Sequence, residues 1–124
     1  MSTNILDKNN GANFYLADLH IHTPVDKNFR CPQGVDPKTV AGKTVIAKGY
    51  IETAKKKNLK IIAVTEHNDV SWIDPIREAT KGTGIIVFPG IELSADSGAR
   101  GIHIIALFNP DRDTADLDDI ITQL

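Results

Sequence analysis

The chain has 124 residues, of which 41% are hydrophobic, and this is enough apolar side chain to bury the core of one domain. Its 14 basic and 16 acidic residues give a formal net charge of -2, which excludes a general electrostatic attraction to nucleic acid or anionic membranes but leaves a local basic patch open. No apolar run is long enough to span a bilayer, and the N-terminus lacks the layout of a signal peptide, so we expect a cytoplasmic protein with no membrane partner. The single cysteine, Cys31, lies in a polar loop without a CxxC partner and is a poor candidate for a metal ligand.

The first strong pattern is an apolar segment, residues 14–22, that ends in two histidines. We predict a β-strand here, preceded by a flexible lead-in over residues 1–13. Because side chains alternate along a strand, Asp18, His20 and His22 are expected to share one face. Two imidazoles that point the same way supply half of a coordination shell for zinc, manganese or iron. A surface strand that merely carries two histidines is the alternative at this point.

A proline-rich segment, residues 23–37, leaves directly from the histidine pair and is predicted to be a long loop. It contains Asp26, a carboxylate that could join a metal site, and Lys27 and Arg30, which could hold a phosphate. The alternative for these three side chains is an ordinary solvated loop.

The next part of the chain alternates between strand and helix patterns. Apolar residues at helical spacing predict a helix over 44–57, with Asn58 as a left-handed stop. A β-branched run predicts a buried strand over 60–67, a short helix follows with Ser71 as its cap, and a third strand is predicted over 84–94. This order predicts right-handed βαβ units and therefore an α/β fold with a parallel sheet or barrel.

The segment after residue 94 breaks the alternation. Only six residues separate the third strand from the apolar run 101–108, whereas a parallel crossover needs about a dozen, so these two strands are expected to form an antiparallel hairpin. A tight turn centred on Ser97 and Gly98 would set Glu92 directly opposite His103, a spacing that suits two ligands of one metal centre.

A final amphipathic helix is predicted from a cap at Thr114 through apolar residues at positions 117, 120, 121 and 124. No glycine, asparagine or proline follows to end this helix. We therefore expect the sequence to be the front part of a longer protein.

All the histidines of the chain fall in predicted strands or at strand ends. Together with one glutamate they form a candidate metal site of His20, His22, His67, His103 and Glu92. Most of these residues follow parallel strands at their C-terminal ends, where α/β sheets and barrels build their active sites. The alternative is four histidines satisfied within a core. Glu66 lies on the opposite strand face from its neighbour His67 and is expected to support the site or the fold rather than to bind metal.

Four segments resemble, in order and spacing, the first motifs of the PHP (polymerase and histidinol phosphatase) domain. They are Ala17–Pro24 (Ala-Asp-Leu-His-Ile-His-Thr-Pro), Val64–Asn68 (Val-Thr-Glu-His-Asn), Pro89–Ser94 (Pro-Gly-Ile-Glu-Leu-Ser) and Ile102–Ala106 (Ile-His-Ile-Ile-Ala). The His-x-His pair alone also fits amidohydrolase barrels. The resemblance implies that residues 14–124 are the N-terminal part of a distorted β/α barrel that binds two or three divalent ions of zinc, manganese or iron.

The resemblance also implies roles for individual residues. Glu92 would bridge two metals, and His20, His22 and Glu92 would form the catalytic centre. Asp26 lies four residues after His22, whereas the family's aspartate usually lies five residues after the second histidine. The implied metal ligands are His20, His22, His67, Glu92, His103 and Asp26.

PHP domains hydrolyse phosphoesters by metal-ion catalysis. The implied function is hydrolysis of a phosphomonoester or a nucleic-acid phosphodiester, and the implied partner is a phosphorylated small molecule or a nucleic-acid end. Residues 17–30 look most like PHP domains fused to SMC-type ATPases, so an ATPase domain or subunit is a further expected partner. A non-catalytic metal-binding or regulatory module of such a protein is the alternative. Because the family's remaining ligands come from later strands, we expect little turnover from these 124 residues alone.

Overall fold

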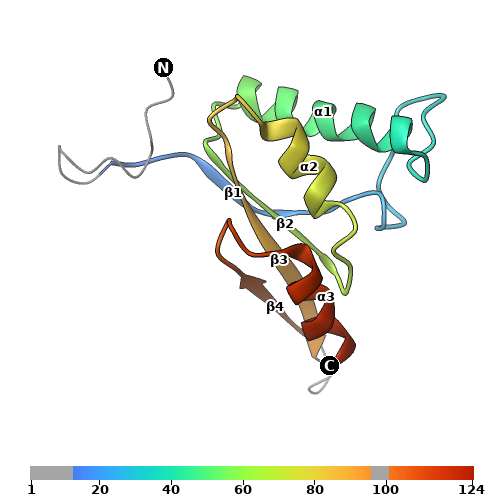
Figure 1. Cartoon of the computed structure of the whole chain (residues 1–124), viewed down its shortest axis with the longest axis vertical. Coiled ribbons are helices and arrows are strands. Elements are labelled where there is room, and N and C mark those ends of the chain that lie inside the picture. The colour runs from blue at the N-terminus through green and yellow to red at the C-terminus, as the bar shows by residue number, and fades with distance from the viewer. Residues whose placement is uncertain (1–12, 96–100) are drawn as a thin grey trace.

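The computed structural model describes residues 13–95 and 101–124, which form a curled four-stranded sheet packed against three helices (Figure 1). The elements in chain order are β1 (Ala17–Ile21), α1 (Val40–Lys56), β2 (Ile61–His67), α2 (Ile73–Thr80), β3 (Ile86–Ala95), β4 (Ile102–Leu107) and α3 (Thr114–Thr122). Strands β1, β2 and β3 are parallel neighbours, and β4 pairs antiparallel with β3. The expected α/β class, with parallel first strands and an antiparallel third and fourth strand, is confirmed. No helix in these two ranges is long and apolar enough to cross a membrane.

One hydrophobic core lies between the helices and one face of the sheet. Because side chains alternate along β2, Ile62 and Val64 both point toward the helices and are buried. The helices contribute Ile46 and Ile51 from α1, Ile73 and Ile76 from α2, and Leu117 from α3. Burying each such side chain stabilises the fold by about 1.5–3 kcal/mol. The opposite face of the sheet carries polar side chains, among them Thr65 and His67.

Helix α1 begins four residues before its predicted start at residue 44. Its cap is Thr39, whose backbone is extended and whose hydroxyl oxygen accepts a hydrogen bond from the Gly42 N–H at 2.9 Å. The apolar periodicity does not reveal this first turn, because the turn contains a glycine. The predicted stop is confirmed, since Asn58 has a left-handed φ of 57° directly after the C-cap.

Two predicted helix caps are wrong by one residue. Helix α2 has Trp72 at its N-cap position without a side-chain cap, and Ser71 instead donates its hydroxyl to the Asp69 carboxylate at 2.5 Å. Helix α3 is capped by Asp113 rather than by Thr114. At α3 the Asp113 carboxylate, a stronger acceptor than a hydroxyl, accepts from the Ala115 N–H at 3.0 Å, whereas at α2 no side chain caps the helix.

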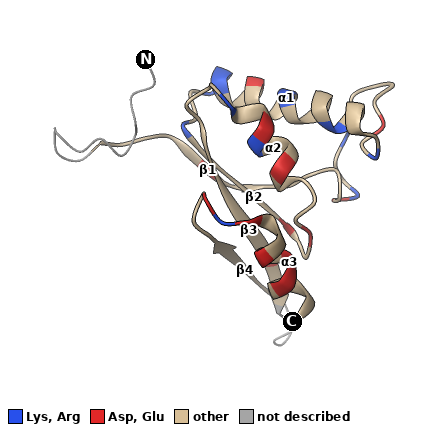
Figure 2. Ribbon diagram, viewed as in Figure 1, with Lys and Arg blue, Asp and Glu red and all other residues tan. Residues whose placement is uncertain are grey.

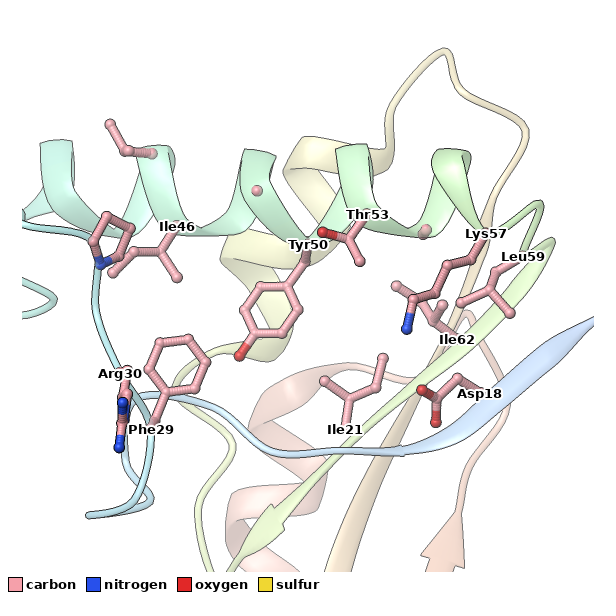
Figure 3. Close-up of a pocket in the computed structure, with 14 residues that line it drawn as sticks. Asp18, Ile21, Phe29, Arg30, Ile46, Tyr50, Thr53, Lys57, Leu59 and Ile62 are labelled. Carbon is pink, nitrogen blue, oxygen red and sulfur yellow. The ribbon is translucent and has the colours of Figure 1, made fainter.

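Strand β1 contains an irregularity between Asp18 and Ile21, which interrupts the regular alternation of its side chains. Asp18 pairs with Ile62 and Ile21 with Val64, so three steps along β1 match only two along β2. Consequently Asp18 and Ile21 both line a cavity of about 430 Å³ beneath α1 (Figure 3), whereas His20 lies on the other face. The prediction that Asp18 and His20 share a face is therefore wrong.

The register of the β3–β4 hairpin also differs from the prediction. His103 pairs with Ser94, and Glu92 pairs with Ile105, so Glu92 and His103 are diagonal rather than direct neighbours. They remain on the same face of the sheet, since they lie two positions apart in the register. The turn predicted at residues 97–98 lies outside the described residues.

Candidate metal centre

Four strands bring the predicted ligands to one end of the sheet. His20 lies in β1 and His22 follows it directly, while His67 is the last residue of β2. The parallel register pairs His67 with Glu92 of β3, so these two side chains are neighbours. His103 reaches the same end from β4, which runs antiparallel.

The Glu92 carboxylate is the centre of this arrangement. Its Oε2 atom lies 3.6 Å from Nε2 of His20, 3.6 Å from Nε2 of His22 and 3.2 Å from Nε2 of His67. The Glu92 side chain is only 5% exposed, and Oε2 is buried without a hydrogen-bond partner among the described residues. Leaving a buried carboxylate oxygen without a donor is costly, so this atom calls for a positively charged partner.

The spacing from Oε2 to each of these nitrogens is that of two donor atoms on one divalent cation. Tetrahedral zinc has ligands at about 2.0–2.1 Å, which places neighbouring donor atoms about 3.3 Å apart. The measured separations of 3.2–3.6 Å from Oε2 to the three nitrogens agree with this value. Imidazole nitrogens and carboxylate oxygens are donors that zinc, manganese and iron accept, and Glu92 belongs both to a group with His20 and His22 and to a group with His67 and His103.

The outer nitrogens of the same rings are held by neighbouring side chains. Nδ1 of His22 lies 3.2 Å from Oε1 of Glu66. An ionised carboxylate only accepts hydrogen bonds, so Nδ1 donates and a neutral His22 keeps its lone pair on Nε2, toward Glu92. The hydroxyl of Thr65 lies 2.9 Å from Nδ1 of His20 and has an equivalent position.

Thr65 and Ser94 are site residues that the sequence analysis did not identify. The Ser94 hydroxyl lies 3.4 Å from Nδ1 of His67, while Thr65 contacts His20. Each of them is two residues away from a predicted ligand on the same strand. The alternation of side chains along β2 and β3 could therefore have identified both residues in the sequence.

Glu66 connects the end of β2 to the segment that follows β1. Its carboxylate accepts hydrogen bonds from the Thr23 N–H at 2.7 Å, the Thr23 hydroxyl at 2.8 Å and the His67 N–H at 2.9 Å. Burial alone would raise the pKa of Glu66, but the hydrogen bonds from His67, Thr23 and His22 outweigh it and lower the pKa below its ordinary value of 4.5. Glu66 is therefore an ionised anchor for the loop that follows His22.

Tyr50 of α1 holds the same loop from the other side. Its hydroxyl donates to the backbone carbonyl of His22 at 2.6 Å. Burial, followed by the negative charge of Glu66, raises the pKa of Tyr50, so the phenol stays a neutral donor. No sequence pattern pointed to this contact, because it depends on how α1 lies over the sheet.

The remaining predicted ligands lie around this cluster. His103 donates from Nδ1 to Oε1 of Glu92 at 2.7 Å and is 58% exposed. Asp26 approaches the outer nitrogen of His22, with Oδ2 3.7 Å from Nδ1, so its ligand role stays a prediction. Cys31 packs against the hydrophobic core. Three overlapping groups in the described ranges have ligand atoms within 4.8 Å of one another, namely His20/His22/Glu92, His22/Glu66/His67 and His67/Glu92/His103.

Comparison with known proteins gives one sequence relative. The chain is 32% identical over 90 residues to a 5′-3′ exoribonuclease of Haemophilus influenzae, and the match covers 73% of this chain and 27% of that protein. No protein-family model matches the sequence.

Two solved structures share the fold. One, from Bifidobacterium adolescentis, is provisionally assigned as a metal-dependent phosphoesterase and has a TM-score of 0.57 at 18% identity. The other is an amidohydrolase from Chromobacterium violaceum with bound sulfate and no metal, with a TM-score of 0.56 at 20% identity. Each match covers 86% of this chain and 32% of the solved chain. The chain thus has the fold found in part of these larger proteins, and it spans about a third of their length.

Proposed function

We propose that this chain forms part of a metal-dependent phosphoesterase that cleaves a nucleic-acid phosphodiester. The observation that carries the proposal is the buried Oε2 atom of Glu92, which has no donor of its own among the described residues and faces three imidazole nitrogens. Such a donor set suits a divalent cation, and divalent cations are the usual means of neutralising phosphoryl oxygens during hydrolysis.

The residues of the chain would have distinct tasks. His20 and His22 would hold one cation and His67 and His103 a second, and the charge of Glu92 would offset the repulsion between the two cations, which neutral imidazoles cannot do. When bound, the metal supplies Lewis-acid polarisation and a water of lowered pKa. Thr65 and Glu66 would keep the histidine rings oriented by binding their outer nitrogens.

The relatives support a phosphate-containing substrate. The Haemophilus influenzae relative is an exoribonuclease, which favours RNA over a small phosphomonoester. One structural neighbour is assigned to phosphoester hydrolysis, and the other holds sulfate, a tetrahedral anion like phosphate. The SMC-type ATPase partner has no support from these relatives.

The proposal is tested first by metal binding. Protein stripped with chelator is titrated with Mn²⁺ and Zn²⁺ by calorimetry, and we expect micromolar or tighter binding that His67→Ala weakens at least tenfold. Lys48→Ala, an exposed change in α1, is the matched control and should leave the affinity unchanged. Failure of the wild-type protein to take up either metal would overturn the proposal.

Catalysis is tested separately under single-turnover conditions, with the protein in large excess over 5′-labelled single-stranded RNA. We expect slow Mn²⁺-dependent cleavage that is absent in chelator and absent in His22→Ala. Binding of metal without any cleavage would favour a metal-binding module that does not catalyse on its own.

A further inference from the structure

A second cavity, of about 400 Å³, is lined in part by the loop that follows the candidate ligand His22. Three segments form it: Pro24 and Val25 from the loop after His22, residues 37–43 at the start of α1, and Ser71 with Trp72 before α2. Pro24 is two residues from His22, so their Cα atoms are at most about 7.6 Å apart. The loops that leave two predicted ligand strands therefore also build this cavity.

The charged groups that line this cavity are both lysines, Lys38 and Lys43. Neither forms an ion pair with a carboxylate in the part of the chain that the structure describes. The acidic side chains close to them in sequence accept hydrogen bonds from other groups: Asp36 from the Lys38 N–H, Asp69 from Ser71, Asp26 from the Asn28 N–H and Asp74 from the Thr114 hydroxyl. Figure 2 shows mainly blue residues on α1 and both colours on the loop before it, whereas the charged residues of α3 are all acidic.

Lys43 is held in place more firmly than a surface lysine. It is half-buried, and its ammonium lies 5.4 Å from the ring centroid of Trp72, which is only 3% exposed. A cation over an indole face is attracted by the ring and loses less freedom when it binds an anion. Lys38 also lines the cavity and is exposed.

We propose that this lysine cavity, defined by Lys38 and Lys43, binds a backbone phosphate of single-stranded nucleic acid next to the phosphodiester held at the metal centre. Two ammonium groups without carboxylate partners form a local anion site in a chain of net charge -2. The apolar residues Pro24, Val25 and Pro37 offer contact surface for a sugar or base. The inference rests on the proposed function, because it names the substrate class of the same site.

The test measures binding without metal, so that the metal centre does not contribute. Fluorescence anisotropy of a labelled five-nucleotide RNA is followed in EDTA for the wild-type chain, Lys43→Gln, Lys38→Gln, Lys43→Arg and Lys55→Gln. We expect Lys43→Gln and Lys38→Gln each to weaken binding about tenfold and to lower the salt dependence by about one phosphate contact. Lys43→Arg keeps the charge and should stay within threefold of wild type. Lys55→Gln, near the far end of the same helix, should stay within twofold.

Competition separates the possible sources of phosphate. We expect unlabelled RNA to displace the probe at far lower concentration than inorganic phosphate does, because a strand makes several contacts. Displacement by inorganic phosphate at the same concentration as RNA would overturn the assignment to a strand and indicate a free-phosphate site. Equal losses in Lys43→Gln and Lys55→Gln would overturn the lysine cavity, as would an absence of RNA binding by the wild type. Metal titration decides the proposed function independently, since none of these lysines belongs to the metal centre.

Discussion

At the scale of single residues, the two buried glutamates behave in opposite ways. Glu66 has hydrogen-bond donors on both carboxylate oxygens, whereas one oxygen of Glu92 has none in the described residues. A buried carboxylate with hydrogen-bond donors stabilises the fold, and one without donors destabilises it. We therefore assign Glu66 to holding the site in shape and Glu92 to binding the cation.

Glu66→Gln should destabilise the metal-free protein. The amide would turn one NH₂ group toward donors such as the Thr23 N–H, and we expect a loss of about 2 kcal/mol or more in the free energy of unfolding. Urea unfolding in EDTA measures this loss. Glu52→Gln, an exposed change in α1, is the control and should alter stability by less than about 0.5 kcal/mol.

The difference in stability between wild type and Glu66→Gln should depend on pH. Because the folded-state pKa of Glu66 is lowered below 4.5, its ionised form contributes stability that is fully present above that value and is lost as the pH falls through the lowered pKa. The difference between wild type and Glu66→Gln should therefore be constant near neutral pH and shrink in acid. A difference that stays constant down to the acid limit of the folded state would contradict this role of Glu66.

At the scale of elements, the two glycines of α1 have different surroundings. A Cβ atom on Gly42 would lie 1.7 Å from the Asp36 carbonyl oxygen and 2.9 Å from the Thr39 hydroxyl, whereas a Cβ on Gly49 would meet nothing within 4 Å. Gly42 thus allows the loop before α1 to pack against the helix start, which places Lys38 and Lys43 around one cavity.

Gly42→Ala should destabilise the chain by about 3 kcal/mol, because the clash is with backbone and displaces the Thr39 cap. Gly49→Ala should stabilise it by about 0.5–1 kcal/mol through helix propensity alone. Thermal or urea unfolding of both variants measures the contrast. Equal effects of the two substitutions would show that the close approach at Gly42 is not a constraint.

The kind and order of the elements could be predicted because they depend on local patterns. The buried run of β2 and the left-handed stop at Asn58 were both evident in the sequence. The first turn of α1 was not evident, because Gly42 allows a close approach to Asp36 and adds nothing to the apolar pattern of the helix. The register of Glu92 and His103 was also missed, because it depends on a connection whose geometry the sequence does not determine.

At the scale of the whole molecule, the meeting of the candidate ligands could be predicted from topology. Parallel strands end at one edge of a sheet, so the histidines at the ends of β1 and β2 and the glutamate in β3 are expected to come together. The contacts that hold them could not be predicted in the same way. Tyr50 reaches the His22 carbonyl and Thr23 reaches Glu66 only because α1 and the 23–39 loop pack against the sheet in this arrangement.

The central claim is that Glu92 is the shared carboxylate of a metal centre, and the stoichiometry of metal binding tests it most directly. Glu92→Gln keeps the size of the side chain but removes its charge, so the repulsion between neighbouring cations is no longer offset. Calorimetric titration with Mn²⁺ should give at least two ions for the wild-type chain and at most one for the folded Glu92→Gln variant. The same number of ions bound to both proteins would contradict the account and remove Glu92 from the centre.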